Sequence, residues 1–104
     1  MMKRFIVLLN DSSEDKNKQF LSFIKDHKLA WWHWLINSWL LIDYSANISA
    51  AEIRDNVKST YGEEVHSLVM ELKEPGEWAG RGPMSEDKNM FKWIEDYWYK
   101  TPTE

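Results

Sequence analysis

The sequence predicts an α+β fold of the ferredoxin-like class, a βαββαβ sandwich with a four-stranded antiparallel sheet and two helices on one face. Short apolar runs and two segments of helical spacing follow one another in the order strand, helix, strand, strand, helix, strand. Both helical segments begin at a serine with an acidic residue three positions on. The 104 residues suffice for one hydrophobic core and are too few for two.

The first strand and helix are indicated at the start of the chain. In residues 4–9, Arg4 is followed by a continuous apolar run, as in a central strand that is buried on both faces. Ser12 then resembles the first residue of a capping box. Phe20 and Ile24 follow at helical spacing, so a helix is expected to end near residue 28.

A hairpin is expected next. The aromatic and aliphatic runs 30–35 and 39–43 are separated by Ile36, Asn37 and Ser38, and Asn and Ser favour a tight turn. In the first run, alternation places Trp32 and Trp34 on one face and Trp31, His33 and Leu35 on the other. Both faces are therefore largely apolar, although a helix layer can cover only one.

A second helix and a fourth strand complete the predicted sandwich. Ser49 and Glu52 form a capping box, and Gly62 is placed as a C-terminal cap. Residues 65–72 then alternate as a strand, with His66, Leu68, Met70 and Leu72 on one face.

The C-terminal part is expected to be a loop followed by a third helix. Glycines and prolines interrupt residues 75–83, and residues 86–100 carry an apolar stripe. One domain is thus expected over 1–104, with a core at 4–74 and a loop and helix at 75–100. The uncovered sheet face is expected to be buried by the third helix or by a second copy of the chain, since large apolar patches are rarely left in water. A homodimer is favoured, with these interface residues: Trp31, His33, Trp34, Trp39, Met90, Ile94 and Trp98.

Composition excludes several classes of protein. Without cysteine there is no disulfide, thiolate zinc site or cysteine nucleophile, which fits a cytoplasmic setting. No apolar stretch is long enough for a membrane span or arranged as a secretory signal, so no membrane association is expected. The net charge is −4, and residues 61–104 hold ten acidic side chains against five basic ones. A basic nucleic-acid footprint is absent from the chain as a whole, so nucleic acid is not a favoured partner.

The sequence also resembles a known group. The segments 30–34 (AWWHW), 38–41 (SWLL), 49–55 (SAAEIRD), 68–72 (LVMEL) and 78–80 (WAG) look like those of the small bacterial proteins called SinR-like. The likeness covers about residues 4–98. Those proteins are similar in fold to the small dimeric subunit of the CRISPR spacer-integration complex, to the VapD ribonucleases and to the GhoS antitoxin.

The resemblance implies a nuclease alternative. In the related nucleases, an Asp at the end of the first strand of each subunit holds a divalent cation across the dimer axis. Here Asn10 occupies that position and Asp11 follows it. Asp11 is therefore the candidate catalytic residue of a metal-dependent ribonuclease or deoxyribonuclease using Mg²⁺ or Mn²⁺. Lys16 and Lys18 would guide phosphate groups.

The remaining candidate functional residues can also be explained by structural roles. His33 could act as a general base, but a packed or interface histidine is the commoner role. No spacing of His27 or His66 indicates a metal site. The segment 76–83 is glycine-rich but matches neither phosphate-binding fingerprint, which leaves Arg81 as a partner for a carboxylate or a phosphate.

Three function hypotheses follow. The leading one is a small non-catalytic binding or regulatory protein that acts as a dimer without a cofactor; the resemblance suggests bacterial or phage defence or a toxin–antitoxin context. The metal-dependent nuclease is the enzyme alternative. The third is an inhibitor that binds a host or phage factor through its acidic C-terminal surface.

Overall fold

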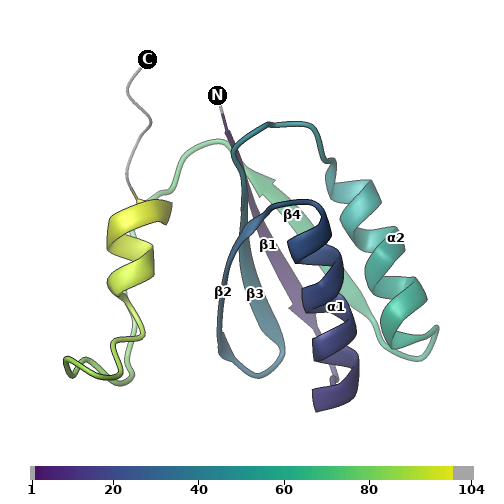
Figure 1. Ribbon diagram of the computed structural model, residues 1–104, viewed down its shortest axis with the longest axis horizontal. Helices are drawn as coiled ribbons and strands as arrows, with labels where there is room; N and C mark the ends of the chain where they lie inside the picture. Colours follow the sequence, from purple (N-terminus) through teal and green to yellow (C-terminus); the bar gives the residue numbers. More distant parts are fainter. Residues whose placement is uncertain (1, 100–104) are drawn as a thin grey trace.

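The computed structural model describes residues 2–99 and shows the predicted α+β architecture. The elements are β1 (Lys3–Leu9), α1 (Glu14–Asp26), β2 (Ala30–Leu35), β3 (Ser38–Asp43), α2 (Ala50–Tyr61), β4 (Ser67–Leu72) and the π-helix η1 (Ile94–Trp98). The four strands form one sheet in the order β2-β3-β1-β4, and every neighbouring pair is antiparallel. Both α1 and α2 lie on one face of this sheet (Figure 1). The ferredoxin-like prediction is confirmed at this level.

The helix ends follow local hydrogen bonding. Ser49 Oγ accepts from the backbone N–H of Glu52 at 3.1 Å, and Gly62 ends α2 with a φ of 95°, as predicted. For α1 the capping residue is Ser13, whose Oγ accepts from the N–H of Lys16. The prediction of Ser12 was wrong by one position, because the Ser12 hydroxyl donates instead to Asn37 Oδ1 at 2.7 Å. Ser12 thereby joins the start of α1 to the β2–β3 turn.

The main core lies between the sheet and the two helices. Phe20 of α1 packs edge-on against Trp39 of β3, with ring centroids 5.1 Å apart, and also contacts Tyr61 of α2. The fully buried side chains of this layer are Phe5, Val7, Phe20, Ile24, Trp39, Leu41, Ile53 and Val57. We call this face of the sheet the inner face.

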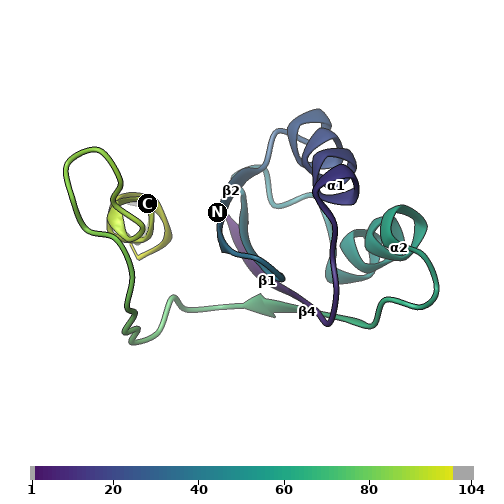
Figure 2. The ribbon, with the colours of Figure 1, turned by 90° about the horizontal axis from the view of Figure 1, so that it is seen from below.

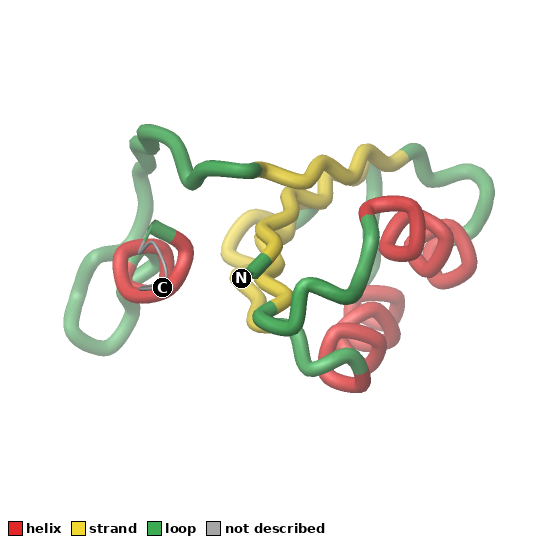
Figure 3. The backbone as a smooth tube through the Cα atoms, turned by 90° about the horizontal axis from the view of Figure 1, so that it is seen from above, coloured by secondary structure: helices red, strands yellow, loops and turns green. Residues whose placement is uncertain are grey.

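The C-terminal segment crosses to the opposite, outer face of the sheet. Figure 2 shows three layers, with the two α-helices on one side of the sheet and the C-terminal helical turn on the other. Figure 3 shows how a long loop after β4 carries the chain there. Side chains of both layers form a second cluster of buried residues, namely Trp32, Ile42, Met90, Phe91, Ile94 and Trp98. Of the two alternatives expected for this face, folding back of the chain is therefore the one observed.

The third helix is much shorter than the predicted 86–100. Helical backbone begins at Lys92, since Asn89 Oδ1 accepts from the N–H groups of Phe91 and Lys92 and so caps the turn. Residues 84–89 instead form a tight turn closed by a bridge between Met84 and Asn89. Of the predicted apolar stripe, Met90, Phe91, Ile94 and Trp98 are buried, whereas Tyr97 is 50% exposed. The predicted end at residue 100 lies outside the described residues.

Candidate functional site

Part of the outer face stays uncovered. The strand register places Leu35, Ser38, Leu8 and Leu68 side by side across all four strands, at the end of the sheet where β1 finishes. Leu35 is 50% exposed, Leu8 38% and Leu68 53%. Met70, beside this row on β4, is 41% exposed. We call Leu8, Leu35, Leu68 and Met70 the uncovered strip; none of these side chains carries a charge.

The strip reaches an edge of the sheet. β4 is the last strand in the order and pairs only with β1 within residues 2–99. Its outward-facing backbone groups are a template on which another strand can pair. The uncovered strip and this edge together form a surface that offers apolar contact and backbone hydrogen bonding.

The seven residues expected at an interface are placed in two groups. Trp39, Met90, Ile94 and Trp98 are buried within the chain itself. Trp31, His33 and Trp34 lie on β2 and keep access to the surface, with Trp31 38% and Trp34 42% exposed. The ammonium of Lys25 lies 5.7 Å from the centroid of the Trp31 ring.

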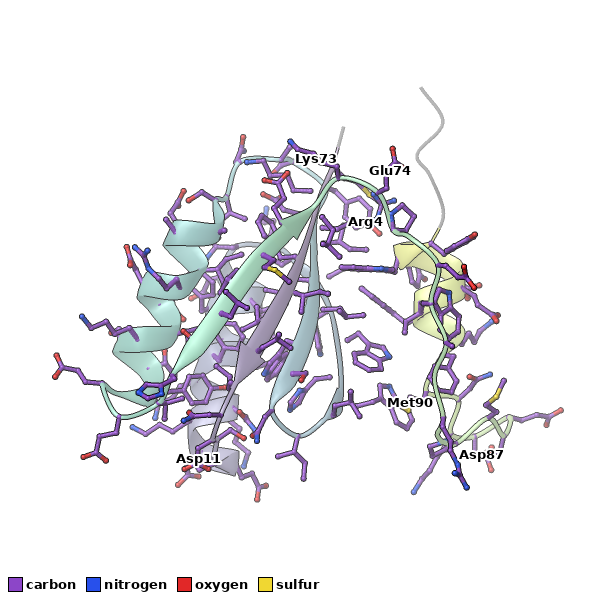
Figure 4. The ribbon with its side chains drawn as sticks, turned by 180° about the vertical axis from the view of Figure 1, so that it is seen from behind. Arg4, Asp11, Lys73, Glu74, Asp87 and Met90 are labelled. Carbon is purple, nitrogen blue, oxygen red and sulfur yellow. The ribbon has the colours of Figure 1, made fainter. Side chains whose placement is uncertain are left out.

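The end of β1 carries Asn10 and Asp11. Asn10 Oδ1 accepts from the backbone N–H of His66 at 2.9 Å, and the N–H of Asn10 donates to the His66 carbonyl at 3.1 Å. Asn10 therefore ties the end of β1 to the start of β4. Asp11 is exposed, accepts from the N–H of Ser12 and lies at the far end of the sheet from Arg4 (Figure 4).

The basic candidates do not converge. Lys16 and Lys18 are exposed on α1, and Lys18 lies 3.8 Å from Glu14. Arg81 is exposed in the C-terminal loop, which lies on the opposite side of the sheet from α1. Among residues 2–99 there is no group of three His, Cys, Asp or Glu side chains that could hold a metal ion.

The glycines of the 76–83 segment have a packing role. A Cβ atom on Gly80 would collide with the Phe91 ring, and one on Gly82 with the Met90 sulfur. Trp78 stacks on Phe91 with ring centroids 5.4 Å apart. The glycines therefore let the loop approach the second cluster closely, and this explains them without a phosphate.

His33 has an unusual environment on the inner face. A bulge in β2 between Trp32 and Leu35 interrupts the pairing with β3. Leu35 therefore lies on the outer face, and the prediction that it shares a face with His33 was wrong. The His33 ring stacks flat on Trp39 at 3.7 Å between centroids. Its Nδ1 lies 2.9 Å from the carbonyl oxygen of Ser38. Burial lowers the pKa of His33, and the hydrogen bond to Ser38 opposes this shift.

No helix among the described residues is long and apolar enough to cross a membrane. Comparison with known proteins gives no match to any family model, curated protein or solved structure.

Sequence reasoning found part of this surface. The alternation in 65–72 predicted that Leu68 and Met70 share one face of the sheet, and the structure shows that this is the outer face. It did not single them out, because their exposure depends on how far the C-terminal segment extends over the sheet. That extent is set by tertiary contacts of Met90 and Trp98, which no local pattern encodes.

Proposed function

We propose that this chain is a small binding protein that acts as a homodimer, with the uncovered strip and the edge of β4 as its contact surface. The observation that carries the proposal is the row of exposed apolar side chains beside an unpaired strand edge. Burying a fully exposed side chain of this size contributes roughly 1.5–3 kcal/mol, and these side chains, which are 38–53% exposed, gain about half of that. Four per subunit offer a substantial driving force, against which association entropy must be set.

The net charge of the chain restricts where a second copy can dock. The chain carries a net charge of −4, so two copies repel one another over most of their surface. Leu8, Leu68 and Met70 carry no charge, and this repulsion is therefore weakest where the strips meet. A two-fold dimer uses the same patch on both subunits, which suits a strip that ends at a free strand edge.

The mass in solution tests this proposal. Size-exclusion chromatography with light scattering should give twice the chain mass of 12.5 kDa for the unmodified protein at micromolar concentration. Met70→Glu should shift the mass towards 12.5 kDa, because the dimer would bury two carboxylates in apolar surroundings.

Met84→Glu is the matched control. Met84 is 67% exposed but lies in the C-terminal loop and not on a strand of the sheet. The same charge change there should leave the dimer intact. A mass of 12.5 kDa for the unmodified protein, or equal dissociation by both variants, would overturn the proposed interface.

A further inference from the structure

A cavity lies between the β2–β3 turn and the start of α1. Its volume is about 430 Å³, which is within the range of small-molecule sites. Trp39, Leu21 and Ile36 give it a mainly apolar lining, and Ser12 and Asn17 add polar groups. None of the uncovered strip residues lines it, so this is a different surface from the proposed dimer contact.

His33 is one of the residues that line the cavity, and its ring is held flat against Trp39. The Ser38 carbonyl can only accept a hydrogen bond, so in the neutral ring Nδ1 carries the hydrogen and Nε2 is an acceptor. Nε2 has no hydrogen-bond partner among the described residues.

The walls of the cavity are fixed by hydrogen bonds between distant segments. Ser12 Oγ donates to Asn37 Oδ1 at 2.7 Å and so joins α1 to the β2–β3 turn. Tyr61 donates its hydroxyl to Asn17 Oδ1 at 2.6 Å, and burial raises the pKa of Tyr61 to about 12, which keeps this donor protonated. A cavity held in shape before binding loses less entropy when a ligand enters.

The charge at the cavity favours a neutral ligand. Lys18 and Glu14 both line it and lie 3.8 Å from one another, so their charges offset. β-Bulges often occur next to functional sites, where they re-aim a side chain, and the bulge in β2 includes His33.

We propose that this cavity binds a small, neutral, planar aromatic molecule carrying an N–H donor, with the ring against the apolar lining and the N–H donating to His33 Nε2. Leu21 and Ile36 would supply the apolar contact, and His33 the orientation.

Indole and 1-methylindole test the proposal as a matched pair of probes, because only indole has the N–H. Titration of ¹⁵N-labelled protein, followed by NMR, should shift amide signals of residues 12–21 and 33–39. Indole should also shift the imidazole ¹⁵N signal of His33 Nε2, whereas 1-methylindole should not. This readout uses the unmodified protein and does not depend on the folding of any variant.

His33→Phe keeps an aromatic ring against Trp39 and removes the acceptor. It should weaken indole binding roughly threefold to tenfold, as expected for one hydrogen bond, and leave 1-methylindole binding unchanged. His27→Phe is the control, since His27 packs on Phe23 and lines a different cavity. Absence of amide shifts around the cavity at millimolar indole, or equal effects of His33→Phe on the two probes, would overturn the proposal.

Discussion

Trp32 donates its indole N–H to the backbone carbonyl of Met90 at 2.6 Å, across 58 positions of sequence. Both residues are buried in the second cluster, between the outer face of the sheet and the C-terminal segment. Arg4 makes a similar contact, with Nε 2.8 Å from the carbonyl oxygen of Trp98. Two side chains of the sheet thus hold the backbone of a segment that has little regular structure of its own, as the lone helical turn in Figure 4 illustrates.

Replacing Trp32 with Phe should loosen this segment. The variant keeps an aromatic side chain in the cluster but leaves the buried Met90 carbonyl without its donor, at an expected cost of about 1–3 kcal/mol. Urea denaturation measures the loss of stability. Relative to the unmodified protein, hydrogen exchange in the variant should accelerate more in residues 90–98 than in α1 and α2. Trp34→Phe, at a position 42% exposed, should change stability by less than about 0.5 kcal/mol. Equal losses in the two variants would contradict the anchoring role of Trp32.

The main elements were predictable from the sequence because each has a local cause. The continuous apolar run of 4–9 and the alternation of 65–72 predicted β1 and β4, and the Ser49 and Gly62 caps predicted α2. Ser12 was misassigned because its sequence context fits a cap equally well. In the folded chain Asn37, which is 25 positions away in the sequence, lies beside Ser12 and accepts its hydrogen bond, so Ser12 joins two segments instead of capping α1.

The buried carboxylate of Asp43 could not be predicted, because its partners depend on the path of the chain after β3. Asp43 is 3% exposed, and its two oxygens accept from the N–H groups of Ser45, Asn47 and Ile48 and from the Ser45 hydroxyl. Burial acts to raise the pKa of Asp43, but these hydrogen bonds together outweigh it, so the pKa lies below its ordinary value.

Asp43→Asn should therefore reduce stability in a pH-dependent manner. An amide has one acceptor oxygen in place of two, so the variant should lose about 1–3 kcal/mol at pH 7. The folded-state pKa of Asp43 lies below the unfolded value of about 3.9, so the stabilisation is complete above roughly pH 4 and is lost as pH falls through the folded-state pKa. Urea denaturation at pH 7 and at about pH 3 should show a large difference between the two proteins at neutral pH and a smaller one in acid. A difference independent of pH would show that the charge of Asp43 is not its cause.

Asn10 and Asp11 should behave differently despite being neighbours. Asn10→Ala removes the hydrogen bond from the His66 N–H that joins the end of β1 to the start of β4, and this should reduce stability by about 1 kcal/mol. Asp11→Ala, at an exposed position, should change stability by less than about 0.5 kcal/mol. Thermal denaturation of both variants gives this comparison.

The same Asp11→Ala protein tests the nuclease alternative. If the chain acts by binding, labelled RNA and DNA with Mg²⁺ or Mn²⁺ should be cleaved no faster by the unmodified protein than by this variant. Cleavage that is abolished by EDTA and by Asp11→Ala, with folding unchanged, would instead make Asp11 a catalytic residue.

His33 should titrate below its ordinary range. Burial disfavours the charged imidazolium and lowers its pKa, while the hydrogen bond to the Ser38 carbonyl acts in the opposite direction. NMR titration of the His33 ring protons should therefore give a midpoint below about 6.5.

The stability that His33 contributes should follow from this titration. The unfolded chain takes up the proton more readily, so the contribution is complete above about pH 6.5 and is lost as pH falls through the folded-state pKa. The free energy of unfolding should fall between roughly pH 7.5 and pH 5.5, and His33→Phe should reduce that fall. A midpoint at or above 6.5, or an identical pH dependence in the variant, would contradict this account. A low pKa also keeps the ring neutral at pH 7, and only in that state can Nε2 accept a hydrogen bond while Nδ1 donates to Ser38.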